Sequence, residues 1–110
     1  MKFTRLDIPD IIIFEPKQYQ DTRGYFMESY NKKIFDDILG FSVEFVQDNH
    51  SLSLKDTLRG LHYQAKPMAQ GKLVRVIRGE VLDVAVDMRK ESKFYGQWIK
   101  ETLSHKITYN

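Results

Sequence analysis

The chain has 110 residues, of which 42% are hydrophobic and 29% are charged, and its net charge is +2. This length suits one domain with one modest core, and we expect a single domain over residues 1–110. Basic residues form no stripe, which argues against nucleic-acid binding, and no apolar run approaches the roughly 20 residues of a membrane span. The absence of cysteine excludes disulfides and thiolate sites and fits a reducing cytoplasm.

The first third of the chain predicts short strands separated by turns. The apolar run at residues 11–14 predicts a strand that Pro16 closes. Residues 21–24, with the sequence DTRG, predict a turn. Alternating side chains at residues 25–30 then predict a second strand, with Phe26 and Glu28 on one face.

Residues 31–40 give the one helix prediction. Asn31 can cap the start of this helix, and Gly40 can end it. Between them, four apolar residues recur at helical spacing and share one face: Ile34, Phe35, Ile38 and Leu39.

The middle of the chain returns to strand-like patterns. Alternation over residues 42–49 predicts a strand on which Gln47 and Asn49 share one face with two apolar residues. The run LRGLHYQ, at residues 58–64, predicts another strand, in which Arg59 and His62 are unusual. Residues 65–71, with Pro67, predict a loop.

Residues 72–88 predict a hairpin that turns at Arg78 and Gly79, although arginine is not favoured at the first position of such a turn. Because both faces of this hairpin are largely apolar, we expect both to be buried. In that register Lys72 and Asp83 are diagonal neighbours, about 7–8 Å apart. A lysine and an aspartate are costly to bury unless they pair or serve a function.

Each of these polar residues also has an ordinary structural explanation. A single histidine in a strand is usually a hydrogen-bonded packing residue, and a buried Lys–Asp pair is usually a simple ion pair. Glu28 is ordinary on an exposed strand face, and amides such as Gln47 and Asn49 are common near turns. Phe26 fits a hydrophobic core better than a stacking platform for a base.

Many short strands and one helix predict an all-β fold, an antiparallel sandwich or barrel. Beyond this pattern, five segments closely resemble the dTDP-4-dehydrorhamnose 3,5-epimerase family, in the family's order and with similar spacing: DTRGYFMESY, FVQDNHSLS, LRGLHYQ, QGKLVRVIRGEVLDVAVDMRKES and YGQW. The resemblance covers most of residues 16–98. It implies a cupin-type jelly roll, a role in deoxysugar biosynthesis, a homodimer, and no metal or organic cofactor.

The resemblance also implies roles for individual residues. His62 would be the general base that removes a proton beside the C4 ketone of a dTDP-4-keto-6-deoxyhexose, which leads to inversion at C3 and C5 through an enolate. Lys72 would stabilise the enolate oxygen and Asp83 would hold Lys72. Arg59 would bind the substrate diphosphate. The nucleotide part would be bound by residues from both protomers, which are Arg23, Phe26, Glu28, Gln47 and Asn49.

The chain departs from the family pattern in its length, since the sequence ends at Asn110. Members of the family continue through further strands, which supply an acidic partner for the catalytic histidine, a tyrosine that acts as the opposite acid, and a second histidine. His105 and Tyr109 do not lie in the matching motifs, so these roles are not transferred to them. We therefore expect an incomplete jelly roll, whose activity as an enzyme is in doubt.

Two other function classes remain open. One is a non-catalytic β-domain that retains nucleotide-sugar binding or dimerisation, as the shortened pattern suggests. The other is a metal-dependent cupin, which needs clustered histidine and carboxylate ligands. The sequence has three histidines and no H-x-H pair, so it predicts no metal site.

Overall fold

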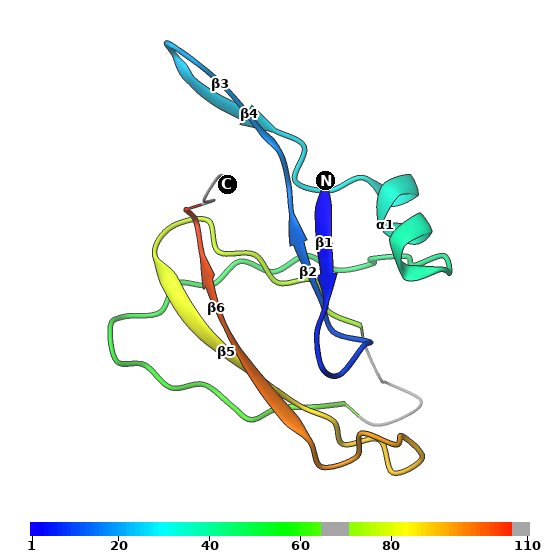
Figure 1. Cartoon of the computed structure of the whole chain (residues 1–110). Coiled ribbons are helices and arrows are strands. Elements are labelled where there is room, and N and C mark those ends of the chain that lie inside the picture. The colour runs from blue at the N-terminus through cyan, green and yellow to red at the C-terminus, as the bar shows by residue number, and fades with distance from the viewer. Residues whose placement is uncertain (65–70, 107–110) are drawn as a thin grey trace.

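The computed structural model describes residues 1–64 and 71–106, and shows strands with one short helix (Figure 1). This agrees with the all-β prediction. No helix in these two described ranges is long and apolar enough to cross a membrane. In chain order the elements are β1 (Lys2–Arg5), β2 (Ile12–Glu15), β3 (Gln18–Asp21), β4 (Gly24–Met27), α1 (Lys32–Leu39), β5 (Glu80–Val86) and β6 (Trp98–Ser104). The strands pair as three antiparallel two-stranded sheets, β1–β2, β3–β4 and β5–β6.

The β1–β2 sheet contains the strand predicted from the apolar run at residues 11–14, and adds β1, which the sequence pattern did not indicate. Phe3 lies opposite Phe14 in this pair. The connecting loop is closed by a backbone hydrogen bond from Leu6 N to Ile11 O at 3.0 Å. Ile8, within the loop, is only 2% exposed, so the loop folds inward and contributes to the small core.

The β3–β4 hairpin confirms the predicted turn at residues 21–24 and projects away from the rest of the chain (Figure 1). The Asp21 carboxylate accepts a hydrogen bond from the backbone N–H of Arg23 at 2.8 Å, which is typical of an aspartate that begins a turn. Tyr19 lies opposite Phe26 across the two strands. The second strand ends at Met27, so it is shorter than the predicted range of residues 25–30.

Helix α1 has both predicted caps. The Asn31 side chain accepts a hydrogen bond from Ile34 N at 3.1 Å, and Gly40 adopts the left-handed conformation with φ of 83°. Phe35 is 2% exposed, and its ring stacks on that of Phe14 with 4.2 Å between centroids. The helix therefore packs against the β1–β2 sheet through the apolar face that the sequence predicted.

The predicted hairpin over residues 72–88 is wrong. β5 pairs instead with β6, in a register that places Asp83 opposite Glu101, and residues 72–77 are in no strand. A two-residue hairpin turn of the favoured type needs positive φ at both central residues, which Arg78 disfavours. The expected burial on both faces is also absent, since Ile77 is 60% exposed and Leu82 is 62% exposed.

The strands predicted at residues 42–49 and 58–64 are also not formed. Residues 41–64 include no strand, although their side chains alternate as the sequence analysis noted. Alternation makes a strand only where a neighbouring strand accepts its backbone hydrogen bonds, and no such neighbour lies beside these residues in the described part of the chain. The loop predicted at residues 65–71 falls almost entirely outside the described residues.

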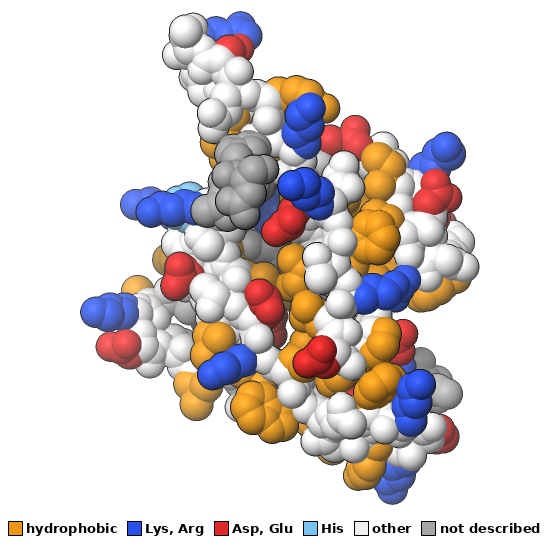
Figure 2. Space-filling model, in the orientation of Figure 1, with side chains coloured by type: hydrophobic (Ala, Val, Ile, Leu, Met, Phe, Trp, Pro, Cys, Tyr) orange, Lys and Arg blue, Asp and Glu red, His pale blue; other side chains and the backbone are white. Residues whose placement is uncertain are grey.

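The chain exposes far more surface than a folded monomer of its mass. Its accessible surface is 9997 Å² for 13.0 kDa, whereas a compact monomer of this size exposes about 6,300 Å². Among the described residues, Ile8 and Phe35 are the only buried hydrophobic ones. Figure 2 accordingly shows hydrophobic side chains spread over the visible surface.

Asp87 anchors a cluster of polar contacts that joins the β1–β2 loop to the segment after β5. Its side chain, which is 2% exposed, accepts hydrogen bonds from Arg89 Nε at 3.0 Å and from Ser92 Oγ at 2.6 Å. Arg89 Nη1 also reaches the Asp10 carboxylate at 2.6 Å. The hydrogen bond from the Arg89 side chain is the largest cause that holds the pKa of Asp87 far below its ordinary value of 3.8.

This cluster should make the stability of the fold sensitive to acid. Because the pKa of Asp87 is lower in the folded chain than in the unfolded chain, its contribution is present above pH 3.8 and is lost as the pH falls below that value. Asp87→Asn should therefore lower the free energy of unfolding at neutral pH. It should also make that free energy decrease less as the pH is lowered. Urea unfolding at a series of pH values measures both effects.

Glu91→Gln is the matched control, since Glu91 is exposed in the same segment and makes no hydrogen bond or ion pair with any described residue. A pH profile for Asp87→Asn that equals that of Glu91→Gln would contradict the assignment of acid sensitivity to Asp87.

Candidate functional site

The segment with Arg59 and His62 is ordered by local contacts, although it is not a strand. Arg59 Nε donates to Ser53 Oγ at 2.8 Å, and Nη2 donates to the Leu52 carbonyl at 3.3 Å. Gly60 has φ of +112°, a conformation that residues with a side chain rarely adopt. The exposed guanidinium of Arg59 is therefore held in one orientation, and the His62 imidazole is open to solvent two residues after Gly60.

The predicted neighbours Lys72 and Asp83 are not paired. None of the ion pairs among the described residues includes either side chain. Lys72 is exposed outside any strand, whereas Asp83 is partly buried in β5, opposite Glu101. The expectation fails because it required the hairpin between residues 72–77 and 80–86, and β5 has β6 as its partner instead.

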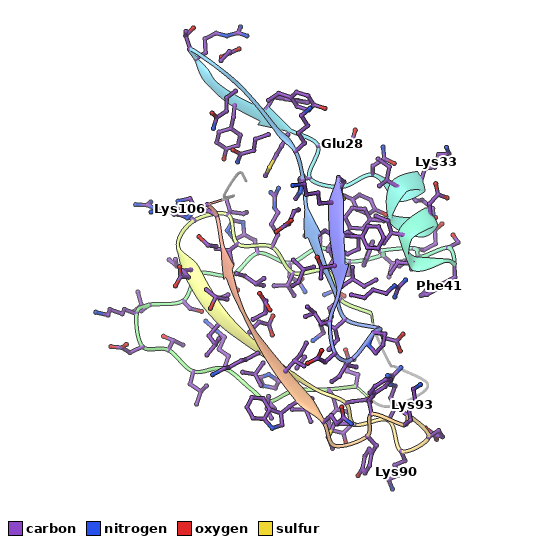
Figure 3. All side chains as sticks on the ribbon, viewed as in Figure 1. Glu28, Lys33, Phe41, Lys90, Lys93 and Lys106 are labelled. Atoms are coloured by element: carbon purple, nitrogen blue, oxygen red, sulfur yellow. The ribbon has the colours of Figure 1, made fainter. Side chains whose placement is uncertain are left out.

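The three candidates in the β3–β4 region lie on or beside the projecting hairpin. Arg23 is at the turn, where its Nη2 is 2.6 Å from Asp21 Oδ2 and its side chain is 88% exposed. The hydrogen bond from the Arg23 side chain lowers the pKa of Asp21. Phe26 is 72% exposed, so it is not a core residue of this chain. Figure 3 shows Glu28 at the base of the hairpin, between β4 and α1.

The two candidate amides are in contact. Gln47 Nε2 donates to Asn49 Oδ1 at 3.2 Å, which places both side chains on the same side of the chain. Both are exposed. Lys32 and Asp36 on α1 bind residues 42–44, just before the amides, and these contacts were not predicted from the sequence. The available signal was the spacing of four residues between a lysine and an aspartate on one helix.

Among the described residues, no hydrogen bond or ion pair joins Arg59, His62, Lys72, Asp83 or the candidates of the β3–β4 region to one another. Two open hollows among the described residues have volumes of about 300 Å³ and 330 Å³, and neither of these two is lined by a candidate residue. No group of three or more histidine and acidic side chains in the described part of the chain could hold a metal ion. Chemically, Arg59 offers an oriented guanidinium for an anion, His62 an imidazole with two ring nitrogens, and Gln47 with Asn49 an amide pair for hydrogen bonding.

Comparison with known proteins gives a consistent family match. The family model for dTDP-4-dehydrorhamnose 3,5-epimerase matches residues 5–109. The dTDP-4-dehydrorhamnose 3,5-epimerase of Shigella flexneri is 59% identical over 104 residues, which are 94% of this chain and 58% of that protein. The chain therefore spans little more than half the length of this curated relative.

Solved structures show the same similarity in three dimensions. The dTDP-4-dehydrorhamnose 3,5-epimerase from Elizabethkingia anophelis superposes with a TM-score of 0.90 at 44% identity. The match covers 97% of this chain and 58% of the Elizabethkingia chain. The dTDP-6-deoxy-D-glucose-3,5-epimerase from Legionella pneumophila, solved in complex with dTDP-4-keto-L-rhamnose, also gives a TM-score of 0.90, at 48% identity. This second match covers 96% of this chain and 56% of the Legionella chain.

Proposed function

Because the chain belongs to the dTDP-4-dehydrorhamnose 3,5-epimerase family, we propose that it binds a dTDP-4-keto-6-deoxyhexose and takes part in the inversion of its C3 and C5 carbons. The observation that carries this proposal is the segment of Arg59 and His62, in which Ser53 orients the guanidinium and the imidazole is open to solvent. The ligand named for the Legionella structure belongs to the same substrate class.

The proposed chemistry begins with proton removal. The carbons beside a ketone are acidic, because the carbanion that forms is stabilised as an enolate. In the proposal, His62 accepts the proton from such a carbon, and the Lys72 ammonium approaches the C4 oxygen as negative charge develops there. Asp83 is not paired with Lys72 in this structure, so we give Asp83 no separate part in the proton transfer.

The proposed binding mode uses the remaining candidates for the nucleotide. Arg59 would bind the diphosphate. Because its guanidinium is already oriented, the side chain loses little conformational freedom when the ligand binds. Gln47, Asn49 and Phe26 would contact the nucleoside, together with two charged residues of the β3–β4 region, Arg23 and Glu28. The cytoplasmic location expected from the cysteine-free sequence stays a prediction.

A second candidate function is a nucleotide-sugar-binding domain without catalysis. The observation that favours it is that Lys72 and Asp83 form no ion pair, while the proposed diphosphate residue, Arg59, is held by two hydrogen bonds. This alternative shares the binding step and lacks proton transfer, so separate measurements of binding and of proton exchange distinguish the two functions.

The proton-transfer step predicts deuterium incorporation into the 4-keto substrate in D₂O. If His62 removes the proton, exchange beside the ketone should exceed the buffer rate, because general base catalysis contributes about 10²–10⁴-fold. His62→Ala should remove this excess, whereas His50→Ala, at an exposed histidine without a hydrogen bond to described residues, should retain it. Mass spectrometry follows exchange, and NMR follows inversion in the same samples. Exchange at the buffer rate with dTDP binding intact would favour the non-catalytic alternative.

The binding step predicts measurable affinity for dTDP in isothermal titration calorimetry. Arg59→Ala should weaken binding by roughly tenfold or more, since a hydrogen bond to a charged group contributes about 1.5–3 kcal/mol. Arg75→Ala is the matched control, because Arg75 is exposed and makes no hydrogen bond or ion pair with described residues. Equal affinities of these two variants would show that Arg59 is not the diphosphate ligand.

The proposed homodimer is supported by the large exposed surface. The excess over a compact monomer is about 3,700 Å² for one chain, which is more than the roughly 1,000–2,500 Å² that each partner of an obligate interface buries. We therefore expect a dimer or a larger assembly, with unpaired strand edges as further points of association. Light scattering at micromolar concentration measures the mass, and a uniform monomer would refute this expectation.

A further inference from the structure

Lys32 and Asp36, one turn apart on α1, bind the segment that follows the helix. Lys32 Nζ donates to Asp36 Oδ2 at 2.6 Å, to Ser42 Oγ at 2.9 Å and to the Val43 carbonyl at 3.2 Å. The other carboxylate oxygen, Asp36 Oδ1, accepts the backbone N–H of Val43 at 3.0 Å. These four residues, Lys32, Asp36, Ser42 and Val43, form what we call the helix clamp, which satisfies both backbone polar groups of Val43.

An aromatic contact fixes the same segment two residues further on. The rings of Tyr30 and Phe45 meet edge to face, with 5.6 Å between centroids. Tyr30 also contacts Phe35, the buried residue of α1, at 4.9 Å. Residues 42–45 are thus tied to the helix at two points, and Gln47 follows after a single intervening residue.

The charges of the clamp are stabilised by their surroundings. The hydrogen bond from the Lys32 side chain is the largest cause that lowers the pKa of Asp36, and the bond from Val43 N adds to it. In return, the hydrogen bond to Asp36 raises the pKa of Lys32. Asp36 is also shielded, with its side chain only 21% exposed. Both groups therefore stay charged throughout the neutral range.

The lysine and the aspartate next to the two charged residues of the helix clamp take no part in it. Lys33 and Asp37 directly follow Lys32 and Asp36 in the sequence, yet both are exposed, and their side chains make no hydrogen bond or ion pair with any described residue. Figure 3 shows Lys33 on the outer side of α1. The two doublets, KK and DD, thus each contain one residue in the clamp and one natural control.

We propose that Asp36 and Lys32 are positioning residues for nucleotide binding, which hold residues 42–45 so that the Gln47–Asn49 amide pair is presented in its binding arrangement. This inference rests on the proposed function, in which these amides contact the nucleotide. The physical basis is pre-organisation: a segment that is already ordered pays less conformational entropy when the ligand binds. Neither clamp residue needs to touch the ligand.

The test compares dTDP affinity in matched pairs of variants by calorimetry. Asp36→Ala removes the carboxylate from the clamp, while Asp37→Ala makes the same change one residue away and gains the same helix propensity. We expect a roughly three- to tenfold rise in Kd for Asp36→Ala and no change for Asp37→Ala, within the range of couplings measured for residues in one network. Asp36→Asn should recover part of the affinity, because its amide oxygen can still accept the Val43 N–H.

A double-mutant cycle separates positioning from general stability. If the clamp acts through Gln47, the loss caused by Asp36→Ala should shrink toward zero when Gln47 is already alanine. A loss of the same size in both backgrounds would overturn the proposal, because it would show that the effect does not pass through Gln47. Should Asp36→Ala fail to fold, as judged by circular dichroism, Lys32→Met against Lys33→Met provides the same comparison with the helix acids intact.

The outcomes also distinguish this inference from the function on which it rests. If the unmodified chain binds dTDP and both members of each pair bind equally, the positioning role is wrong while the binding function stands. If the unmodified chain does not bind dTDP at all, the proposed function fails, and the positioning role fails with it.

Discussion

The ring of Phe35 joins three parts of the chain that would otherwise be independent. It stacks on Phe14 of β2 and meets the edge of Tyr30, which in turn contacts Phe45 beyond the helix. Aromatic pairs of this kind contribute about 0.5–1.5 kcal/mol beyond the area they bury. Because the described residues bury only one other hydrophobic side chain, that of Ile8, this aromatic chain sets the position of both the N-terminal sheet and the segment with the candidate amides.

Polar contacts of two arginines also join segments that are far apart in the sequence. Arg5 spans from β1 to the Ile38 carbonyl at 2.8 Å, at the C-terminal end of α1, where a positive charge also complements the helix dipole. Arg89 binds both the nearby Asp87 and Asp10, which lies 79 positions before Arg89 in the sequence. Each guanidinium binds groups from two separate segments, because Arg5 also donates to the Pro9 carbonyl at 2.8 Å, and a planar fork of five N–H donors allows this. In a chain with so small a core, these arginines replace apolar contacts between elements.

The features that could be predicted from the sequence are those determined by nearby residues. The caps at Asn31 and Gly40 and the Asp21 turn depend on neighbours within four positions, and the structure confirms them. The pairing of β5 could not be derived in this way, because its partner β6 begins twelve residues after β5 ends and the apolar run before β5 looked equally suitable. The expected Lys72–Asp83 pair failed for that reason. Family resemblance, by contrast, depends on residue identity and not on pairing, so it identified the family that the comparisons confirm.

The irregular stretch at residues 41–64 has a consequence for how the protein behaves in solution. Val46 is 93% exposed and Leu58 is 92% exposed, and the backbone between them offers donors and acceptors without a strand partner. Proline interrupts strand addition, but none occurs between Pro16 and Pro67. Exposed apolar side chains beside unpaired backbone favour association between chains, so we expect this stretch to make concentrated protein prone to strand-to-strand aggregation.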